Sequence, residues 1–257
     1  MGRLLLTSAM SNTQHIVAPS ERVLQILACV ARQGQAVSVR ELAEQTGLPL
    51  STVYRHLGVL KKWGWVQEHA RSGLYEPGPL AVPLAHGFDQ HSWLMQTARP
   101  EIERLAERSG ESVGLLCYLH GQVACLDMVE SSRSLPSSFA KGRVNATIRG
   151  ATAKALLAFL PEVLQQQVMD QYLPDKGDER SALALELQHI RHCRYATSEN
   201  EVDPGVWGVS APVFSGRRQL IATLSLMAAS SSAERRQQDY INLTLTAADR
   251  ISRRLQD

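Results

Sequence analysis

The chain has 257 residues, of which 44% are hydrophobic and 20% are charged, and 11 are prolines. A composition of this kind belongs to a folded protein, which excludes wholesale disorder and collagen-like repeats. No stretch approaches the roughly 18 to 20 consecutive apolar residues that span a bilayer, and the apolar run in residues 1–10 is too short for a signal peptide. We therefore expect a cytoplasmic protein of one large domain or two ordinary ones, with Met10 as an alternative start.

The formal net charge is only +2, but it is unevenly divided along the chain. Residues 1–88 hold 8 Lys and Arg against 5 Asp and Glu, or +3, whereas the remainder holds 19 against 20, or −1. An excess of positive charge at the N-terminal end is a weak indication of nucleic-acid binding. The four cysteines form no CxxC pair, so the sequence indicates neither a disulfide framework nor a thiolate zinc site.

Two short helices are predicted after a disordered lead, residues 1–19. Ser20 is a suitable N-cap for the first helix, and the apolar residues from Val23 to Val30 are spaced as one helix face. Gly34 ends this helix. Ser38 opens the second helix, and Gly47 closes it, because glycine tolerates a left-handed cap.

A third helix is predicted to begin at Ser51. Its inward face is Val53, Leu57 and Leu60, and its opposite face carries Thr52, Tyr54, Arg55 and His56. Residues 64–68 and 74–76 then alternate like the two strands of a hairpin. Two helices with a glycine-containing turn, followed by such a hairpin, predict a winged helix-turn-helix over residues 20–78.

The outward face of the third helix suits the reading of DNA. A helix in the major groove needs hydrogen-bond donors and methyl groups that reach the base edges. The residues that meet this need are Ser51, Thr52, Tyr54 and Arg55, of which Arg55 is best suited to a guanine or a phosphate. Phosphate contacts are expected from Arg40, Lys61, Lys62 and Arg71. The alternative for each cation is a solvated surface position, and for Ser51 a capping role alone.

The rest of the chain is predicted to be a linker helix and an α+β domain. The linker covers residues 79–92, interrupted by Pro83 and closed near Gly87. The domain covers residues 93–257 and has an antiparallel sheet with flanking helices. Its predicted strands are 112–118, 122–128, 135–139, 206–214 and 220–227. Its predicted helices are 94–106, 151–160, 162–171, 183–192 and 232–255.

The order of these segments and several short strings resemble the IclR family of bacterial transcription regulators. The matching N-terminal strings are residues 20–27, Glu41 to Pro49 and Ser51 to Leu57. The C-terminal strings are Ala153 to Ala158, which resembles the family's GKALLA, and Val209 to Val213, with a looser match from Arg194 to Gly205. The resemblance implies a winged helix that binds operator DNA as a dimer or tetramer, and a GAF-like domain that binds a small acid.

The family binds the carboxylate of its ligand through main-chain amides that match Gly150 and Ala151. Free N–H groups and the dipole at a helix start favour an anion there. Further expected effector contacts are Arg149, Ser198, Trp207, Gly208, Ser225 and Met227, where core packing is the alternative for Trp207 and plain exposure for Arg149. Arg149, Gly208 and Met227 depart from the family pattern, which argues against glyoxylate and predicts a differently shaped pocket for a larger acid.

We expect a DNA-binding regulator, most simply a repressor of a catabolic operon, whose operator affinity changes when a small carboxylate or sugar acid binds. The chain has no GxSxG, P-loop or HExxH motif, so no cofactor or catalytic residue is expected. His189 and His192 with Cys193 lack further zinc donors nearby, and Cys117 and Cys125 are expected to be core residues rather than a redox pair. A metabolic enzyme with an N-terminal assembly module remains the alternative.

Overall fold

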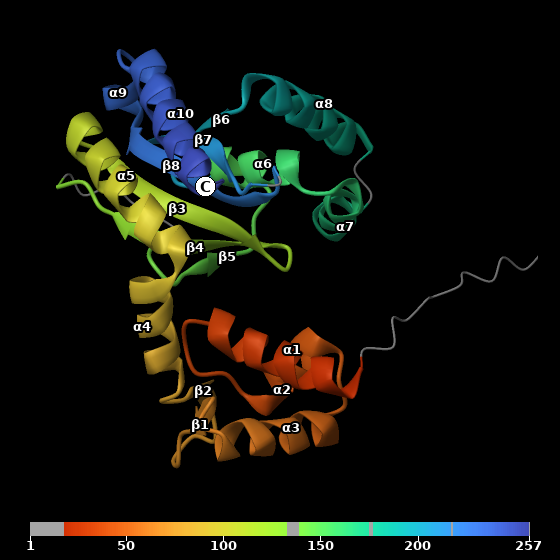
Figure 1. Ribbon diagram of the computed structural model, residues 1–257. Coiled ribbons are helices and arrows are strands. Elements are labelled where there is room, and N and C mark those ends of the chain that lie inside the picture. Colours follow the sequence, from red (N-terminus) through yellow and green to blue (C-terminus); the bar gives the residue numbers. More distant parts are fainter. Residues whose placement is uncertain (1–17, 133–138, 175–176, 217, 257) are drawn as a thin grey trace, which may run out of the picture. The chain divides into compact units, whose positions relative to one another are not determined.

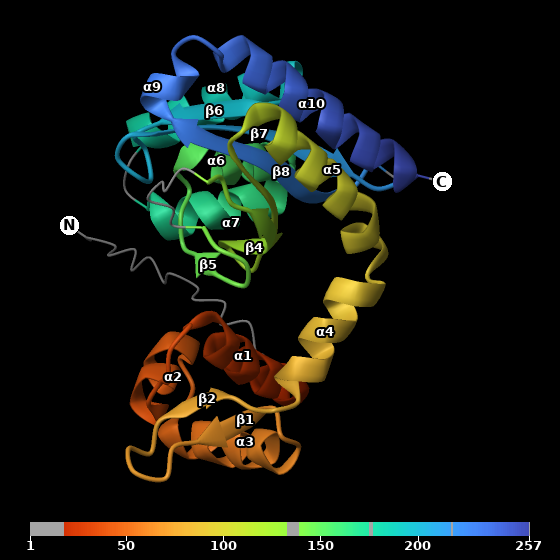
Figure 2. The same cartoon turned by 90° about the vertical axis from the view of Figure 1, so that its left-hand side faces the viewer.

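The computed structural model describes residues 18–132, 139–174, 177–216 and 218–256 (Figures 1 and 2). The chain divides into two compact units, one that ends at Pro83 and one that begins at Leu84. Each unit has its own hydrophobic core. No helix within the described ranges is long and apolar enough to cross a membrane.

Three helices and a hairpin form the N-terminal unit. The helices are α1 (Pro19–Arg32), α2 (Val39–Thr46) and α3 (Leu50–Lys62), and the hairpin is β1 (Val66–Glu68) and β2 (Tyr75–Pro77). Ile26, Leu42 and Leu57, one from each helix, are almost completely buried together. The three helices therefore enclose a small core, and the hairpin extends from it as a wing.

Of the three serines predicted to be N-caps of these helices, only one is. Ser38 caps α2 as predicted: its hydroxyl accepts the Glu41 N–H, and the Glu41 carboxylate accepts the Ser38 N–H. Ser20 and Ser51 are not N-caps, because α1 begins at Pro19 and α3 begins at Leu50, after Pro49. Proline fits a helix start well, since its missing N–H has no helical partner there in any case.

Gly78 follows β2 where the backbone passes directly against the start of the wing. A Cβ atom at residue 78 would lie 2.3 Å from the carbonyl oxygen of Gly64 and 2.8 Å from the nitrogen of Val66. Backbone atoms cannot yield as a flexible side chain does, and overpacking typically costs about 1–3 kcal/mol. We expect Gly78→Ala to lower the free energy of unfolding of this unit by about 2 kcal/mol or more in urea denaturation.

Gly58→Ala is the matched control for this prediction. Gly58 lies in α3, and a Cβ there would have open space around it. Alanine favours a helix over glycine by roughly 1 kcal/mol, so this variant should be as stable as the wild type or more so. An unchanged urea midpoint for Gly78→Ala would show that the chain relaxes around the added methyl group.

The next helix, α4 (Ala81–His91), corresponds to the predicted linker. The sequence predicted an interruption at Pro83 and an end near Gly87, but the helix continues through both residues. Pro83 lies in the first turn, where no intrahelical hydrogen bond is lost. The helix buries none of its residues, and Val82 and Leu84 are 70% and 60% exposed.

A six-stranded antiparallel sheet is the centre of the C-terminal unit. The strands, in spatial order, are β5 (Val144–Asn145), β4 (Gln122–Val129), β3 (Ser112–Leu119), β8 (Leu220–Ala229), β7 (Val206–Phe214) and β6 (Ala196–Glu199). The helices α5 (Trp93–Ser109) and α10 (Gln237–Arg254) cover one face. The other face packs against α6 (Gly150–Phe159), with α7 (Glu162–Tyr172) and α8 (Gly177–Cys193) beyond it (Figures 1 and 2).

The predicted α+β architecture with an antiparallel sheet is confirmed. Two short strands, β5 and β6, were not predicted, because two and four residues are too few to show an alternating pattern. The predicted strand 135–139 lies mostly outside the described residues, and Phe139 is not in a strand. The predicted final helix is two helices, α9 (Ser230–Ala233) and α10.

Candidate DNA interface and effector pocket

The exposed face of α3 carries most of the residues predicted to read DNA. Ser51, Tyr54 and Arg55 are exposed, whereas Thr52 is half-buried. Val53, Leu57 and Leu60 turn inward and fix the rotation of the helix. Within the described residues, Arg55 forms no ion pair that would occupy its guanidinium. The face is therefore polar, has a free cation, and is held in place by the core behind it.

His56 does not belong to that face, although the sequence predicted it there. It is buried beside Val53 and Leu60, and its Nε2 atom has no hydrogen-bond partner within the described residues. Burial lowers the pKa of His56, and the positive charges of Arg55 and Arg22 lower it further. The imidazole is therefore neutral near pH 7.

The shifted pKa of His56 predicts acid destabilisation of the N-terminal unit. The unfolded chain takes up a proton at a higher pH than the folded one, so stability is complete above about pH 6.5 and falls below it. His56→Leu should show a smaller fall than the wild type when urea midpoints at about pH 7.5 and about pH 5.5 are compared. Equal falls in both proteins would assign the acid sensitivity to other groups.

The predicted phosphate-binding cations have different surroundings. Arg40, Lys62 and Arg71 are exposed, and Arg71 lies at the tip of the wing. Lys61 instead forms an ion pair with Glu68 of β1, and its ammonium lies 6.0 Å from the centre of the Tyr75 ring. The hydrogen bond to Glu68 raises the pKa of Lys61. Lys61 thus ties the end of α3 to the wing, which leaves it less free for a phosphate than the sequence suggested.

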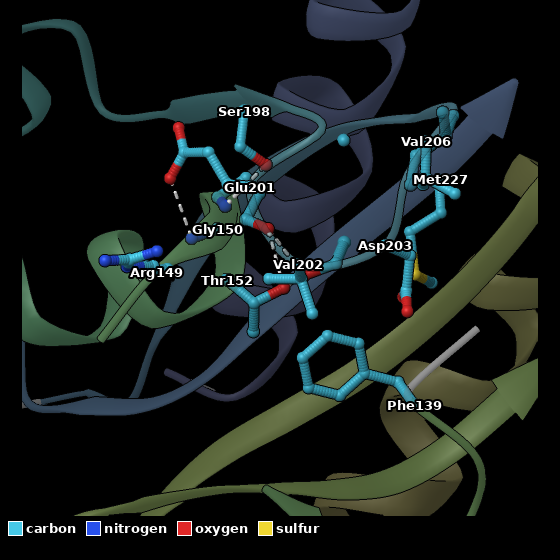
Figure 3. A pocket seen from close by; sticks show the side chains of 15 residues that line it. Phe139, Arg149, Gly150, Thr152, Ser198, Glu201, Val202, Asp203, Val206 and Met227 are labelled. Carbon is cyan, nitrogen blue, oxygen red and sulfur yellow. Dashed lines mark hydrogen bonds between the residues drawn. The ribbon is translucent and has the colours of Figure 1, made fainter. Parts of the chain in front are cut away.

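A small pocket in the C-terminal unit gathers most of the predicted effector residues. It lies between the N-terminal end of α6, the loop from β6 to β7 and the strands β7 and β8 (Figure 3). Of the eight predicted residues, seven line it: Arg149, Gly150, Ala151, Ser198, Gly208, Ser225 and Met227. The lining residues that the sequence did not indicate are Phe139, Thr152, Glu201, Val202, Asp203, Val206, Ser210 and Leu226.

Strand register explains which residues meet in this pocket. Gly208 pairs with Ser198 on one side and with Met227 on the other, and Ser210 pairs with Ser225 in the next row. Trp207, predicted to line the pocket, is the exception, because neighbouring residues of a strand point to opposite faces. Its ring is buried under α10, 6.1 Å from the ring of Tyr240. Applied strictly, the same alternation would have found Ser210 and excluded Trp207.

The two amides predicted to hold an anion already donate to side-chain oxygens. The Gly150 N–H donates to Oε2 of Glu201 (3.0 Å), and the Ala151 N–H donates to Oγ of Ser198 (2.8 Å) (Figure 3). Glu201 comes from the loop between β6 and β7. A carboxylate of the chain itself therefore occupies the N-terminal end of α6, where the helix dipole favours negative charge.

Lys154 forms an ion pair with the second oxygen of the Glu201 carboxylate. Its ammonium is buried and lies 2.7 Å from Oε1 of Glu201 and 2.7 Å from Oε1 of Glu186. Burial alone lowers the pKa of Lys154, but the hydrogen bonds to Glu186 and Glu201 outweigh it, and the pKa is raised. Lys154 is therefore charged, and Glu201 bridges a buried cation and a helix terminus.

Three hydroxyl groups form the floor of the pocket. Thr152 Oγ1 lies 3.1 Å from Ser210 Oγ and 3.0 Å from Ser225 Oγ, and the two serine oxygens are 2.7 Å apart. All three residues are buried. Hydroxyls both donate and accept, so this cluster can turn its protons toward a polar ligand without losing every internal bond.

The pocket is small. Its cavity volume is about 40 Å³, enough for only a few water molecules. Val202 lies over Gly150, where a Cβ atom would come within 2.7 Å of its Cγ2. A neighbouring cavity of about 470 Å³ shares Arg149 and Glu201 with the pocket. Arg149 is exposed, and its side chain lies away from Phe139 and Met227 (Figure 3).

Family models match both units of the chain. Residues 20–70 match the IclR helix-turn-helix domain, and residues 89–253 match the C-terminal domain of bacterial IclR transcriptional regulators. The chain belongs to the IclR family. This chain is therefore a DNA-binding transcriptional regulator. Repressors are among its relatives.

Individual IclR relatives agree with this assignment along most of the chain. The regulator BhcR of Paracoccus denitrificans is 27% identical over 80% of this chain and 75% of its own length. The acetate operon repressor of Salmonella typhimurium is 26% identical over 80% of this chain and 77% of its own. The fold is similar to that of an IclR regulator from Silicibacter sp. TM1040, with a TM-score of 0.80 and 23% identity over 93% of this chain and 96% of that one.

A further IclR homologue was solved with a bound aromatic acid. The protein from Microbacterium hydrocarbonoxydans, complexed with 4-hydroxybenzoate, has a TM-score of 0.70 and 20% identity over 93% of this chain and 99% of that one. At this identity the likeness concerns the fold alone.

Proposed function

We propose that this IclR-family protein is a repressor of a catabolic operon whose operator affinity is controlled by a small carboxylate or sugar acid bound at the N-terminal end of α6. The observation that carries the proposal is the hydrogen bond from the Gly150 N–H to a carboxylate oxygen of Glu201. It marks a position at which backbone, helix dipole and a buried lysine all suit a carboxylate. Glu201 then stands where the carboxylate of the effector would bind.

Binding of an effector requires Glu201 to leave its position. Pockets for organic ligands usually have volumes of about 300–1,000 Å³, far above the volume of about 40 Å³ that this pocket has with Glu201 in place. Because Glu201 and Arg149 line both this cavity and its neighbour of about 470 Å³, withdrawal of Glu201 joins the two spaces. The acid then takes over the Gly150 N–H, and Lys154 retains its partner Glu186.

Glu201→Gln tests this competition. The amide oxygen still fits the Gly150 N–H, but a neutral group competes less strongly than a carboxylate, because hydrogen bonds to charged groups are roughly twice as strong. We expect acids that stabilise the full chain in a thermal-shift screen of carboxylates and sugar acids to bind Glu201→Gln about tenfold more tightly. The matched control is Glu199→Gln, an exposed carboxylate on β6, which should bind as the wild type does. Unchanged or weaker binding to Glu201→Gln would place the effector elsewhere.

The pocket favours binding without turnover. Among its described lining residues there is no histidine or cysteine, and the three hydroxyls bond to one another rather than to a general base. We therefore infer that an effector leaves the pocket chemically unchanged and that the protein is not an enzyme.

A route from the pocket to the linker supports control of operator affinity. Phe139 lines the pocket, and two residues later Lys141 donates to Oδ2 of Asp89 in α4 (2.8 Å) and lies 3.5 Å from the buried Asp127. We propose that movement at Phe139 shifts this ion pair and thereby α4. An effector controls DNA binding only if it binds the two arrangements with different affinity.

We also propose the domain boundaries, the assembly and the operator contacts of this regulator. The winged helix is assigned residues 20–78, the linker 79–92 and the effector domain 93–257. The exposed apolar residues of α4, including Val82 and Leu84, support assembly as a homodimer or tetramer. Operator contacts are assigned to Ser51, Tyr54 and Arg55 on α3, with Arg40, Lys62 and Arg71 on phosphates.

A further inference from the structure

A second cavity in the C-terminal unit lies between the C-terminal ends of α8 and α10 and the turn from β7 to β8. Its volume is about 580 Å³, and it shares no residue with the proposed effector pocket. Four arginines line it and come from three segments: Arg191 and Arg194 at the C-terminal end of α8, Arg218 in the turn and Arg253 of α10. Segments far apart in sequence thus bring four guanidinium groups to one concave surface.

Among the described lining residues, the negative charges do not balance the arginines. Asp249 is the one acidic residue among the described lining residues, and it lies 3.2 Å from Arg194. The C-terminal ends of α8 and α10 each add about half a negative charge. Neutralising these groups takes about two of the four arginines, which leaves a surplus of about two positive charges among the described lining residues. Arg218 and Arg253 form no side-chain ion pair within the described part of the chain.

Two of these arginines occupy backbone positions that suit glycine better. Arg194 has a φ of 65° and Arg218 a φ of 55°, a region that side chains with a Cβ rarely adopt. The Arg194 N–H donates to Ile190 O at the end of α8, and the Arg218 N–H donates to Ser215 O in the turn, both at 2.8 Å. Glycine would make the same backbone hydrogen bonds without strain. What arginine adds at both places is its guanidinium.

We propose that this cavity is a second ligand site and that it binds a phosphorylated small molecule. A surplus of two positive charges matches a phosphate dianion, and the planar guanidinium fork suits phosphate oxygens. Phe159 and Phe214, whose rings meet edge to face at 5.3 Å, provide an apolar wall for the carbon part of the ligand. Arg191 is held in place by hydrogen bonds to Ala158 O (2.6 Å) and Gln165 Oε1 (2.8 Å). The volume lies within the usual range for small-molecule sites.

Calorimetric titration of the full-length protein with inorganic pyrophosphate, at constant ionic strength, tests the proposal. We expect saturable binding by the wild type and about tenfold weaker binding by Arg218→Gly. Glycine relieves the positive φ at this position, so the variant should unfold at the same temperature as the wild type or a higher one. Arg235→Ala removes an exposed arginine outside the cavity and should bind pyrophosphate as the wild type does.

Three results would overturn the proposal. The first is absence of saturable pyrophosphate binding by the wild type. The second is equal affinity of Arg218→Gly and the wild type. The third is a weaker affinity of Arg218→Gly for operator DNA with unchanged pyrophosphate binding, which would mean that the phosphates recognised here are those of a DNA backbone. None of these results depends on the carboxylate pocket, so the proposed effector site is tested separately.

Discussion

Arg55→Ala should weaken binding to the specific operator by about tenfold to hundredfold, because a side chain that contacts a base through two hydrogen bonds contributes roughly 1–3 kcal/mol. The fold should be unaffected, since Arg55 is exposed and the inward residues of α3 stay in place. The measurement is fluorescence anisotropy with DNA from the region upstream of the gene, compared with unrelated DNA, over a range of salt concentrations.

Arg71→Ala is the informative comparison for Arg55→Ala. Arg71 lies at the wing tip and is assigned to a phosphate, so its loss should weaken binding to all sequences alike and lower the salt dependence by about one unit of slope. Arg108→Ala, which removes an exposed cation of α5, should change neither binding nor its salt dependence. If Arg55→Ala bound the operator with the affinity of the wild type, α3 would not be the reading helix in the proposed orientation.

Gly150→Ala should shift the response to the acid to much higher acid concentrations while operator binding persists. Gly150 has a φ of 86°, and an added Cβ atom would lie 2.7 Å from Cγ2 of Val202. The added methyl group, together with the strain of a positive φ for alanine, therefore displaces the first turn of α6, which carries the Gly150 N–H. Loss of one charge-assisted hydrogen bond weakens acid binding by about tenfold to hundredfold. The checks are calorimetric titration with an acid found in the thermal-shift screen, and DNA binding with and without that acid.

Gly208→Ala is the matched control, because it adds a methyl group to the same pocket without a clash. The nearest atom to its Cβ would be Ser198 Oγ, at 3.6 Å, which is ordinary contact. This variant should fold normally and lose only a few-fold in acid affinity through reduced space, of the order of one buried methyl group. If acid binding to Gly150→Ala matched that of the wild type in a folded protein, the N-terminal end of α6 would not be the effector site.

Local patterns in the sequence predict much of the fold. Three such patterns depend only on neighbours within one or two helical turns, so the sequence predicts them correctly. They are the capping pair Ser38 and Glu41, the left-handed Gly47, and the inward spacing of Val53, Leu57 and Leu60. Long strands such as Val206–Phe214 are equally visible. The strands β5 and β6 are not, because a short strand is stabilised by its partner rather than by its own residues.

The candidate effector pocket could be predicted only in part. Gly150 and Ala151 were indicated by their place before a helix, and Gly208 and Met227 by the family pattern. Ser210 could have been found by counting alternate residues from Gly208, and the same count assigns Trp207 to the opposite face. No local signal indicates Glu201 as the partner of Gly150, since 51 residues separate them.

The sequence by itself determined the family, the two-part organisation of a winged helix and a sheet domain, and the surplus of positive charge in the first 88 residues. These follow from local propensity, from the order of motifs and from composition. Only the tertiary structure decided that Lys61 is tied to the wing, that His56 is buried, and that Glu201 occupies the amide of Gly150. Each of these features depends on which residues, distant in the sequence, the fold brings together. Strand register and helix packing set those distances, and neighbouring residues in the sequence do not.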